Sequence, residues 1–189
     1  MYKGDRSIFF RESLSNWRDT GSIMPSSNFL ARRMAQPIGE NETKLVVVEL
    51  GPGTGAFTRF TLNILPSDAR LITIEMNPVL KQRLSQNISD PRCEIVAGDA
   101  SDLPKILAEK GIAKVDYIIS GIPLGNLDEV SRKKLYNAVK MSLKKDGVYT
   151  QFQYFMANFA EIKKHFSVTH LAWEWRNIPP AFVYTCKLL

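Results

Sequence analysis

The stretch VVVELGPGTGAF, residues 46–57, decides which class of fold this chain can adopt. Apolar residues typical of a buried strand lead into Glu49, glycines follow at Gly51, Gly53 and Gly55, and an apolar run of helical character comes next. Glycines allow a backbone to approach a ligand closely, and the N-terminus of a helix offers N–H groups and a partial positive charge. The stretch therefore predicts a ligand site at the carboxyl edge of a sheet.

From residue 45 onward, strand and helix patterns alternate. Runs typical of buried strands occupy residues 45–50, 70–75, 93–98, 114–120 and 147–155. Helical patterns lie between them at residues 56–65, 77–87, 101–110 and 127–143, the third with Ser101 or Asp102 as its expected cap. A short helix near 159–165 precedes two strands, 167–175 and 181–189, which are joined without an intervening helix. These patterns predict an α/β fold with a mostly parallel, seven-stranded sheet, helices on both faces and an antiparallel C-terminal hairpin.

Length and composition allow one well-cored domain. The chain has 189 residues, 44% of them hydrophobic, which is too little for two ordinary domains. We expect residues 41–189 to form that domain and residues 1–40 to form an N-terminal helical extension with a loop that covers the ligand. No apolar run approaches the roughly 20 residues of a membrane span, and no secretory signal is visible. Cys93 and Cys186 are expected to be reduced core residues, so the protein is predicted to be cytoplasmic.

The chain is moderately basic, with a net charge of +6. Such an excess is compatible with a nucleic acid, with an anionic membrane or with no particular partner. In residues 7–18, Phe10, Leu14 and Trp17 share one helical face, which predicts a helix that either packs on the domain or touches a membrane surface. The helix predicted from residue 128 onward carries many lysines, and its basic face is either solvated or turned towards a membrane.

Two cofactors fit the glycine loop. From Gly51 to Ala56 the chain satisfies the pattern G-x-G-x-x-G/A of nicotinamide dinucleotide sites. Glu49 argues against that ligand, because a carboxylate repels a pyrophosphate and attracts the ammonium and sulfonium groups of S-adenosylmethionine. Glu75 and Asp99 follow the next two strands, where they could accept hydrogen bonds from ribose hydroxyls and from an adenine amino group. Three acidic residues at one sheet edge therefore favour S-adenosylmethionine as cofactor, with S-adenosylhomocysteine as product.

Four motifs, ELGPGTGAFT (49–58), IEMNP (74–78), GDASDLP (98–104) and KDGVYTQFQY (145–154), resemble those of class I S-adenosylmethionine-dependent methyltransferases. Three more, GSIMPSS (21–27), VDYIISGIPL (115–124) and NIPPAFVY (177–184), are similar to the bacterial phospholipid N-methyltransferase family. The resemblance runs from about residue 8 to residue 188. It implies a Rossmann-like class I methyltransferase fold and an enzyme that methylates a membrane phospholipid, phosphatidylethanolamine.

The resemblance also implies roles for particular residues. The positions that match the cofactor site are Glu49, Gly51, Gly53, Gly55, Glu75, Met76, Asp99, Ala100 and Ser120, with Ser26 and Ser27 in an N-terminal loop that closes over the cofactor. The segment expected under the reacting methyl group, where it would orient the amine, comprises Ser120, Gly121, Ile122 and Pro123. Tyr154 is a further candidate for contact with the headgroup, although it is also suited to core packing. No metal is expected.

The segment SGIPLG (120–125) bears on the methyl acceptor. Related nucleic-acid adenine methyltransferases carry here an aromatic residue that stacks on the flipped base, whereas this chain has Leu124. An aliphatic amine of a lipid headgroup is therefore favoured over a nucleic acid, and Phe9, Phe10 and Trp17 are the expected membrane anchors. Alternatives that stay open are an rRNA adenine N6-methyltransferase-like enzyme, a methyltransferase of a small soluble amine, and a non-catalytic cofactor- or membrane-binding module.

Overall fold

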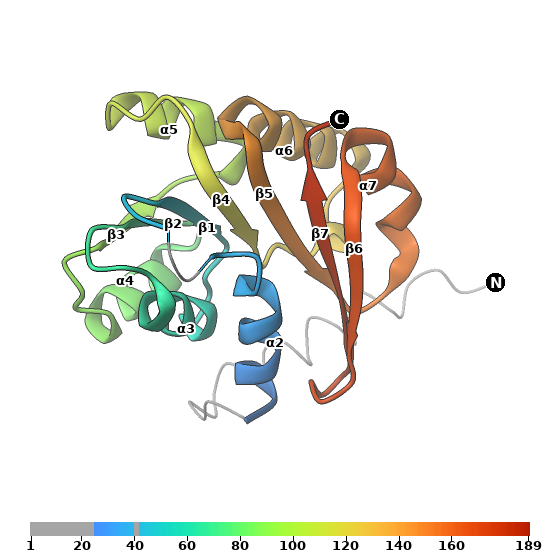
Figure 1. Cartoon of the computed structure of the whole chain (residues 1–189), viewed down its shortest axis with the longest axis horizontal. Helices are drawn as coiled ribbons and strands as arrows, with labels where there is room; N and C mark the ends of the chain where they lie inside the picture. Colours follow the sequence, from blue (N-terminus) through green and yellow to red (C-terminus); the bar gives the residue numbers. More distant parts are fainter. Residues whose placement is uncertain (1–24, 40–41) are drawn as a thin grey trace.

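The computed structural model describes residues 25–39 and 42–189, with side chains from residue 28 onward. The strands in these residues are β1 (Val46–Leu50), β2 (Arg70–Glu75), β3 (Cys93–Ala97), β4 (Val115–Ser120), β5 (Leu143–Gln153), β6 (Ser167–Glu174) and β7 (Ala181–Lys187). They form one sheet of order β3-β2-β1-β4-β5-β7-β6 (Figure 1). In this order, each neighbouring pair from β3 to β5 is parallel. β7 pairs antiparallel with both β5 and β6. The predicted mostly parallel sheet with an antiparallel C-terminal hairpin is confirmed.

Helices cover both faces of this sheet (Figure 1). They are α2 (Pro25–Ala35), α3 (Ala56–Ile64), α4 (Pro78–Asn87), α5 (Leu103–Glu109), α6 (Glu129–Ser142) and α7 (Phe159–His165). Because side chains of a strand alternate between faces, Val48 and Leu50 join the apolar layer under α5, α6 and α7. Val47 joins the opposite layer, which contains residues of α2 and α3. Among the described residues, no helix is long and apolar enough to cross a membrane.

Helix α2 is packed on the domain. Its residues Leu30 and Met34 are buried, and it contacts α3 and the strands β5, β6 and β7. The helix predicted at residues 7–18, including Phe9, Phe10 and Trp17, lies outside the described residues. The proposed division of the chain near residue 40 stays a prediction.

The boundary between α6 and β5 differs from the sequence prediction. Helix α6 ends at Ser142 and β5 begins at Leu143, not at residue 147. The pairing of β4 with β5 shifts register between the contacts Val115–Leu143 and Tyr117–Val148, which indicates a bulge. Leu143 is buried, whereas the lysines after it are exposed. The first residues of β5 therefore lack the apolar pattern of a strand, which is why the sequence did not reveal where β5 begins.

The cap before α5 also differs from the prediction. A 3₁₀ turn, η1 (Ala100–Asp102), precedes the helix, and the Asp99 side chain accepts a hydrogen bond from the backbone N–H of Ser101 at 2.8 Å. Asp102 makes no side-chain cap. The capping carboxylate therefore lies earlier in the chain than expected, and this places Asp99 directly after β3 at the sheet edge.

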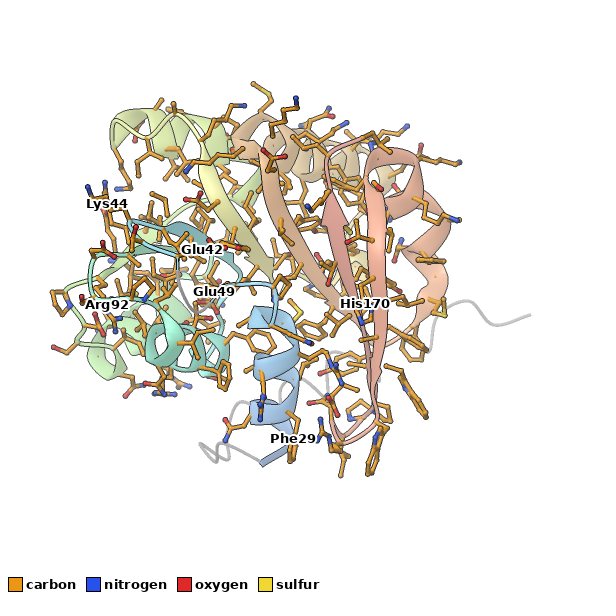
Figure 2. All side chains as sticks on the ribbon, viewed as in Figure 1. Phe29, Glu42, Lys44, Glu49, Arg92 and His170 are labelled. Carbon is orange, nitrogen blue, oxygen red and sulfur yellow. The ribbon has the colours of Figure 1, made fainter. Side chains whose placement is uncertain are left out.

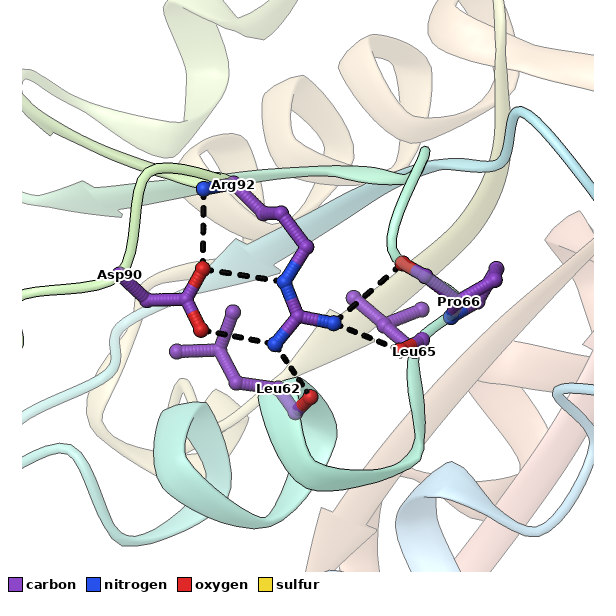
Figure 3. Close-up of polar contacts among 5 residues, drawn as sticks. All are labelled: Leu62, Leu65, Pro66, Asp90 and Arg92. Carbon is purple, nitrogen blue, oxygen red and sulfur yellow. Dashed lines mark hydrogen bonds and ion pairs between the residues drawn. The ribbon is translucent and has the colours of Figure 1, made fainter.

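Arg92 ties the end of α3 to the loop before β3 (Figure 3). Its guanidinium donates to the backbone carbonyl oxygens of Leu62, Leu65 and Pro66 at 2.8, 2.6 and 3.3 Å. It also donates to both carboxylate oxygens of Asp90, at 3.0 and 2.7 Å. These bonds lower the pKa of Asp90 to about 2. Arg92 thus satisfies carbonyl groups that the end of a helix otherwise leaves unpaired.

We expect Arg92→Ala to lower the free energy of unfolding by about 2 kcal/mol, because several carbonyl groups and one carboxylate lose their donor together. Urea denaturation at neutral pH measures the change. The matched control is Arg70→Ala, since Arg70 is half exposed and forms a 3.7 Å ion pair with Glu94 that is accessible to solvent. An equal loss in both variants would contradict the structural role of Arg92.

Candidate functional site

A cleft of about 1280 Å³ opens at the carboxyl ends of the central parallel strands. Loops after β1, β2, β3 and β4 contribute to its wall, as do the end of β5 and the turn between β6 and β7. Parallel strands bring their carboxyl ends to one edge, so segments far apart in the sequence meet here. The side chains and backbone that form the wall include Gly51, Gly53, Phe57, Glu75, Met76, Asn77, Asp99, Ala100, Gly121, Ile122, Pro123, Lys134, Phe152, Tyr154 and Asn177.

The glycine loop turns sharply between β1 and α3. Gly51, Gly53 and Gly55 have positive φ angles of 68°, 57° and 85°, which disfavour any side chain. The N–H of Gly51 donates to the carbonyl of Ile74 at 3.0 Å, which fixes the loop against β2. Gly55 does not line the cleft: a methyl group there would lie 2.5 Å from a side-chain carbon of Leu84, so this glycine allows the loop to pack on α4.

Glu75 ends β2 and reaches the cleft with both carboxylate oxygens held. One oxygen accepts from the backbone N–H of Asn77 at 2.8 Å, and the other accepts from the N–H of Gly53 at 3.2 Å. Asn77 in turn caps α4, because its side-chain oxygen accepts from the N–H of Val79 at 2.9 Å. Glu75 therefore links the glycine loop to the start of α4. With Asp99 at the end of the next strand, it gives this part of the cleft an acidic wall.

Glu49 lies beneath the glycine loop and is fully buried in β1 (Figure 2). The Thr58 hydroxyl donates to its Oε2 at 2.7 Å, while its Oε1 has no hydrogen-bond partner among the described residues. Burial raises the pKa of Glu49 to about 7, and the neighbouring charge of Glu75 acts in the same direction. Glu49 does not line the cleft and lies behind its wall.

The segment after β4 lies against the glycine loop. The N–H of Gly121 donates to the carbonyl of Leu50 at 2.8 Å. A methyl group at Gly121 would lie 2.8 Å from the carbonyl oxygen of Gly51, so only glycine fits. Ser120 is fully buried, does not line the cleft, and accepts a hydrogen bond from the N–H of Ile122 at 3.3 Å. The Ser120 hydroxyl therefore holds the backbone of residues 121–123 from behind the wall of the cleft.

Two glutamines of β5 hold this segment, and neither was identified from the sequence. The amide nitrogen of Gln151 donates to the carbonyls of Ile122 and Phe152 at 3.0 and 2.8 Å. The amide of Gln153 donates to the same two carbonyls at 3.1 and 2.6 Å. The Tyr149 hydroxyl donates to the Gln151 side-chain oxygen at 2.7 Å and orients that amide. Polar residues at alternate positions of the buried strand YTQFQ were the signal that could have revealed them.

Three aromatic side chains, which we call the aromatic corner, form another part of the wall: Phe57, Phe152 and Tyr154. The Phe152 ring lies 5.5 Å from each of the other two, at interplanar angles of 73° and 81°. Burial raises the pKa of Tyr154, and a hydrogen bond with Asn177 opposes the shift, so the phenol stays neutral at physiological pH. Asn177 follows β6 and was not expected from the sequence to reach the site.

The structure brings many of the expected site residues to one cleft and leaves others out. Residues that line it are Gly51, Gly53, Glu75, Met76, Asp99, Ala100, Gly121, Pro123 and Tyr154, whereas Glu49, Gly55 and Ser120 lie behind its wall. Ser26 and Ser27 were expected in a loop, but their backbone forms the first turn of α2, and their side chains are outside the described part. Asn77, Lys134 and Phe57 line the cleft without having been singled out.

The arrangement suits a cationic ligand that also carries hydroxyl and amino groups. Glu75 and Asp99 offer carboxylate oxygens, and buried Glu49 adds negative potential when ionised. Among the described residues that line the cleft, Lys134 is the one basic side chain, so a pyrophosphate would meet more negative than positive charge. Within the described chain, no group of three His, Cys, Asp or Glu residues could hold a metal ion.

Known proteins provide an independent comparison. The family described as "Methyltransferase domain" matches residues 47–147 of this chain. An ornithine lipid N-methyltransferase of Singulisphaera acidiphila is 29% identical over 185 residues, which cover 97% of this chain and 96% of that protein. A ribosomal RNA small subunit methyltransferase A of Thermosynechococcus vestitus is 34% identical, but over 43% of this chain and 30% of its own length. A solved methyltransferase structure from Aquifex aeolicus shares the fold, with a TM-score of 0.71, 11% identity and coverage of 93% and 98%.

Gly121→Ala should weaken binding of S-adenosylhomocysteine, the ligand that the sequence predicts, by roughly ten-fold or more. The added methyl meets the backbone of Gly51, so the glycine loop must move, and overpacking of this kind costs about 1–3 kcal/mol. Isothermal titration calorimetry measures the affinity. Gly125→Ala is the matched control because a methyl group there meets open space. Unchanged affinity of Gly121→Ala would show that the contact between the loops is not needed.

A second expectation concerns the pH dependence of stability. The pKa of Glu49 is about 7 in the folded chain and 4.5 in the unfolded chain. Protonation of Glu49 therefore stabilises the folded state fully below pH 4.5, and this stabilisation is lost as the pH rises through 7. Glu49→Gln resembles the protonated side chain, so its free energy of unfolding should exceed that of the wild type by about 3 kcal/mol at pH 8 and by less than about 1 kcal/mol at pH 5.

Urea denaturation of the ligand-free protein at both pH values tests this expectation. Glu109→Gln, which removes an exposed carboxylate, serves as the control and should follow the wild type. If the difference between Glu49→Gln and the wild type does not change between pH 5 and pH 8, Glu49 does not titrate in this range.

Proposed function

Since the chain belongs to the methyltransferase domain family, as a class I S-adenosylmethionine-dependent methyltransferase, we propose that it methylates the amine of a membrane-lipid headgroup. The observation that carries this proposal is the extent of its similarity to the ornithine lipid N-methyltransferase. That similarity covers nearly all of both chains, whereas the ribosomal RNA methyltransferases match less than half of this one. The candidate headgroups are phosphatidylethanolamine, which the motifs suggest, and an ornithine lipid, which the relative suggests.

The cleft fits S-adenosylmethionine in three respects. The unpartnered oxygen of Glu49 gives negative potential behind the glycine loop, which favours the cationic methionine end. We assign Glu75, at the end of β2, to accept hydrogen bonds from the ribose hydroxyls. We assign Asp99, which follows the end of β3, to accept a hydrogen bond from the adenine amino group. Met76 and Ala100 flank these two carboxylates and are assigned to contact with the adenosine.

The cofactor supplies an activated methyl group, and the protein has to present a neutral amine in line with it while excluding water. The backbone of Gly121–Pro123 is the surface assigned to this task. Gln151 and Gln153 both donate to the Ile122 carbonyl, which fixes the segment and engages that oxygen. Ser120 supports the same backbone from below. We therefore assign Ser120 a positioning role and Gly121 and Pro123 direct contact with the amine.

The aromatic corner suits a small amine better than a planar base. Its rings meet at steep angles, and aromatic faces attract ammonium groups, which favours retention of a partly methylated product. Leu124, which occupies the place of a base-stacking ring, is fully buried and does not line the cleft. Tyr154 is assigned to the headgroup. The amine loses its proton to water at the open side of the cleft, because the carboxylates of the wall are assigned to the adenosine.

We expect labelled methyl groups to enter the lipid extract when the protein acts on vesicles that contain an aminolipid. Parallel reactions contain phosphatidylethanolamine, ornithine lipid, phosphatidylcholine alone, or total RNA, each with labelled S-adenosylmethionine. Thin-layer chromatography then identifies which aminolipid is methylated and how many methyl groups it receives. At a limiting cofactor concentration Gly121→Ala should methylate more slowly than the wild type, whereas Gly125→Ala should keep wild-type activity. Label in RNA alone, or in no acceptor despite measured cofactor binding, would overturn the proposal.

A further inference from the structure

Large apolar side chains are exposed where β6 turns into β7. Trp173, Trp175 and Ile178 are 58%, 65% and 64% exposed. We refer to residues 173–178 as the hairpin end. Two indoles that are more than half exposed contribute little to a core, and Trp is enriched where proteins meet the membrane–water interface. The hairpin end therefore has the composition of an interfacial anchor.

Helix α2 adds aromatic and basic groups beside the hairpin end. The guanidinium of Arg176 lies 4.2 Å from the centre of the Phe29 ring, and Arg33 lies 3.6 Å from the Glu174 carboxylate. Figures 1 and 2 show the start of α2, with Phe29, at the same end of the molecule as the turn of this hairpin. The two segments, which are far apart in the sequence, form one surface at this end of the molecule, and Trp173 projects from the other face of β6 because its neighbours Ala172 and Glu174 face α2.

This surface is basic. A groove of about 620 Å³ between α2, α3 and the hairpin end has as its charged lining residues three arginines, Arg32, Arg33 and Arg176, and one acid, Glu174. Glu174 is buried and accepts two hydrogen bonds from Arg176, at 2.8 and 2.9 Å, which lower its pKa. The acid is thus already engaged within the protein. The remaining positive charge is available to an anionic surface.

The same surface borders the open side of the cleft. Leu30, Tyr154 and Asn177 line the cleft, and each has an exposed apolar neighbour in the sequence: Phe29, Phe155 and Ile178. The register of the sheet places Trp173 opposite Phe182, and Phe182 opposite Gln153 on the other side. The end of β5, which carries the acceptor part of the cleft, therefore lies at the same edge as the hairpin end.

We infer that the hairpin end and the first turns of α2 dock on an anionic lipid bilayer and turn the acceptor side of the cleft towards the headgroups. This inference rests on the proposed function, whereas the docking side chains themselves, Trp173, Trp175 and Arg32, do not line the cleft. Indoles enter the interfacial layer, arginines meet anionic lipids, and a headgroup amine reaches Tyr154 and Asn177 while its acyl chains remain in the bilayer. The predicted anchors Phe9, Phe10 and Trp17 lie outside the described residues, and the docking side chains named above are separate from them.

Sedimentation of the full chain with vesicles tests the inference. Vesicles of phosphatidylglycerol and phosphatidylcholine in equal amounts are compared with phosphatidylcholine alone. The double variant Trp173→Ala/Trp175→Ala should partition roughly ten-fold less to the anionic vesicles, because two interfacial side chains are removed. Arg32→Glu should weaken binding to anionic vesicles and leave binding to phosphatidylcholine unchanged. Val130→Ala/Met141→Ala, which removes exposed apolar side chains from α6, should bind like the wild type.

Two further readouts separate docking from catalysis. All variants should bind S-adenosylhomocysteine like the wild type, which verifies folding. The double tryptophan variant should methylate a short-chain, monomeric aminolipid normally and the same headgroup in vesicles poorly. If the wild type methylates neither form, the proposed function fails while vesicle binding still reports on docking.

Other outcomes overturn the docking surface. If the double tryptophan variant binds vesicles like the wild type and deletion of residues 1–24 abolishes binding, the membrane anchor is the N-terminal segment. A change from dimer to monomer in the double variant, measured by light scattering, would assign the hairpin end to contact with a second copy of the chain.

Discussion

The contact between Gly121 and the carbonyl oxygen of Gly51 is the constraint on which the site depends. β1 and β4 are neighbouring parallel strands, so the loops that leave them must diverge within a few ångströms of each other. The absence of side chains at Gly51 and Gly121 allows both loops to turn at the same level. The glycine loop can then reach Glu75 on β2, while the segment from Gly121 to Pro123 forms the opposite wall. Both of these parts of the cleft wall thus depend on one close approach of backbones.

Electrostatics divides the cleft into two parts. Glu49, Glu75 and Asp99 lie at the carboxyl ends of β1, β2 and β3, and they make one side suitable for a cation with hydroxyl and amino donors. Burial of Glu49 destabilises its ionised form, as its raised pKa shows, and a cationic ligand nearby would offset that penalty. The other side is aromatic and is held by amide groups of β5. This division agrees with a reaction in which a charged donor delivers its methyl group to an amine.

The antiparallel hairpin connects the cleft to the outer surface. β7 lies between β5 and β6, so the hairpin is hydrogen-bonded directly to the strand that carries Gln151 and Gln153. Asn177 belongs to the same turn and reaches Tyr154. The residues that would meet a membrane and those that would meet the headgroup therefore belong to one paired sheet edge, against which α2 packs.

The sequence by itself determined the α/β class, the mostly parallel sheet built from alternating strands and helices, and the sheet edge at which the cleft lies. These features follow from local signals: apolar runs of strand length, helical periodicity, and the glycines at 51, 53 and 55. It also placed Glu75 and Asp99 correctly at strand ends. The tertiary structure alone decided that Glu49 lies behind the wall, that Gln151 and Gln153 hold the Ile122 carbonyl, and that α2 meets the hairpin end. Each of these depends on which face a side chain takes and on the register between strands distant in the sequence, and a periodic pattern specifies neither.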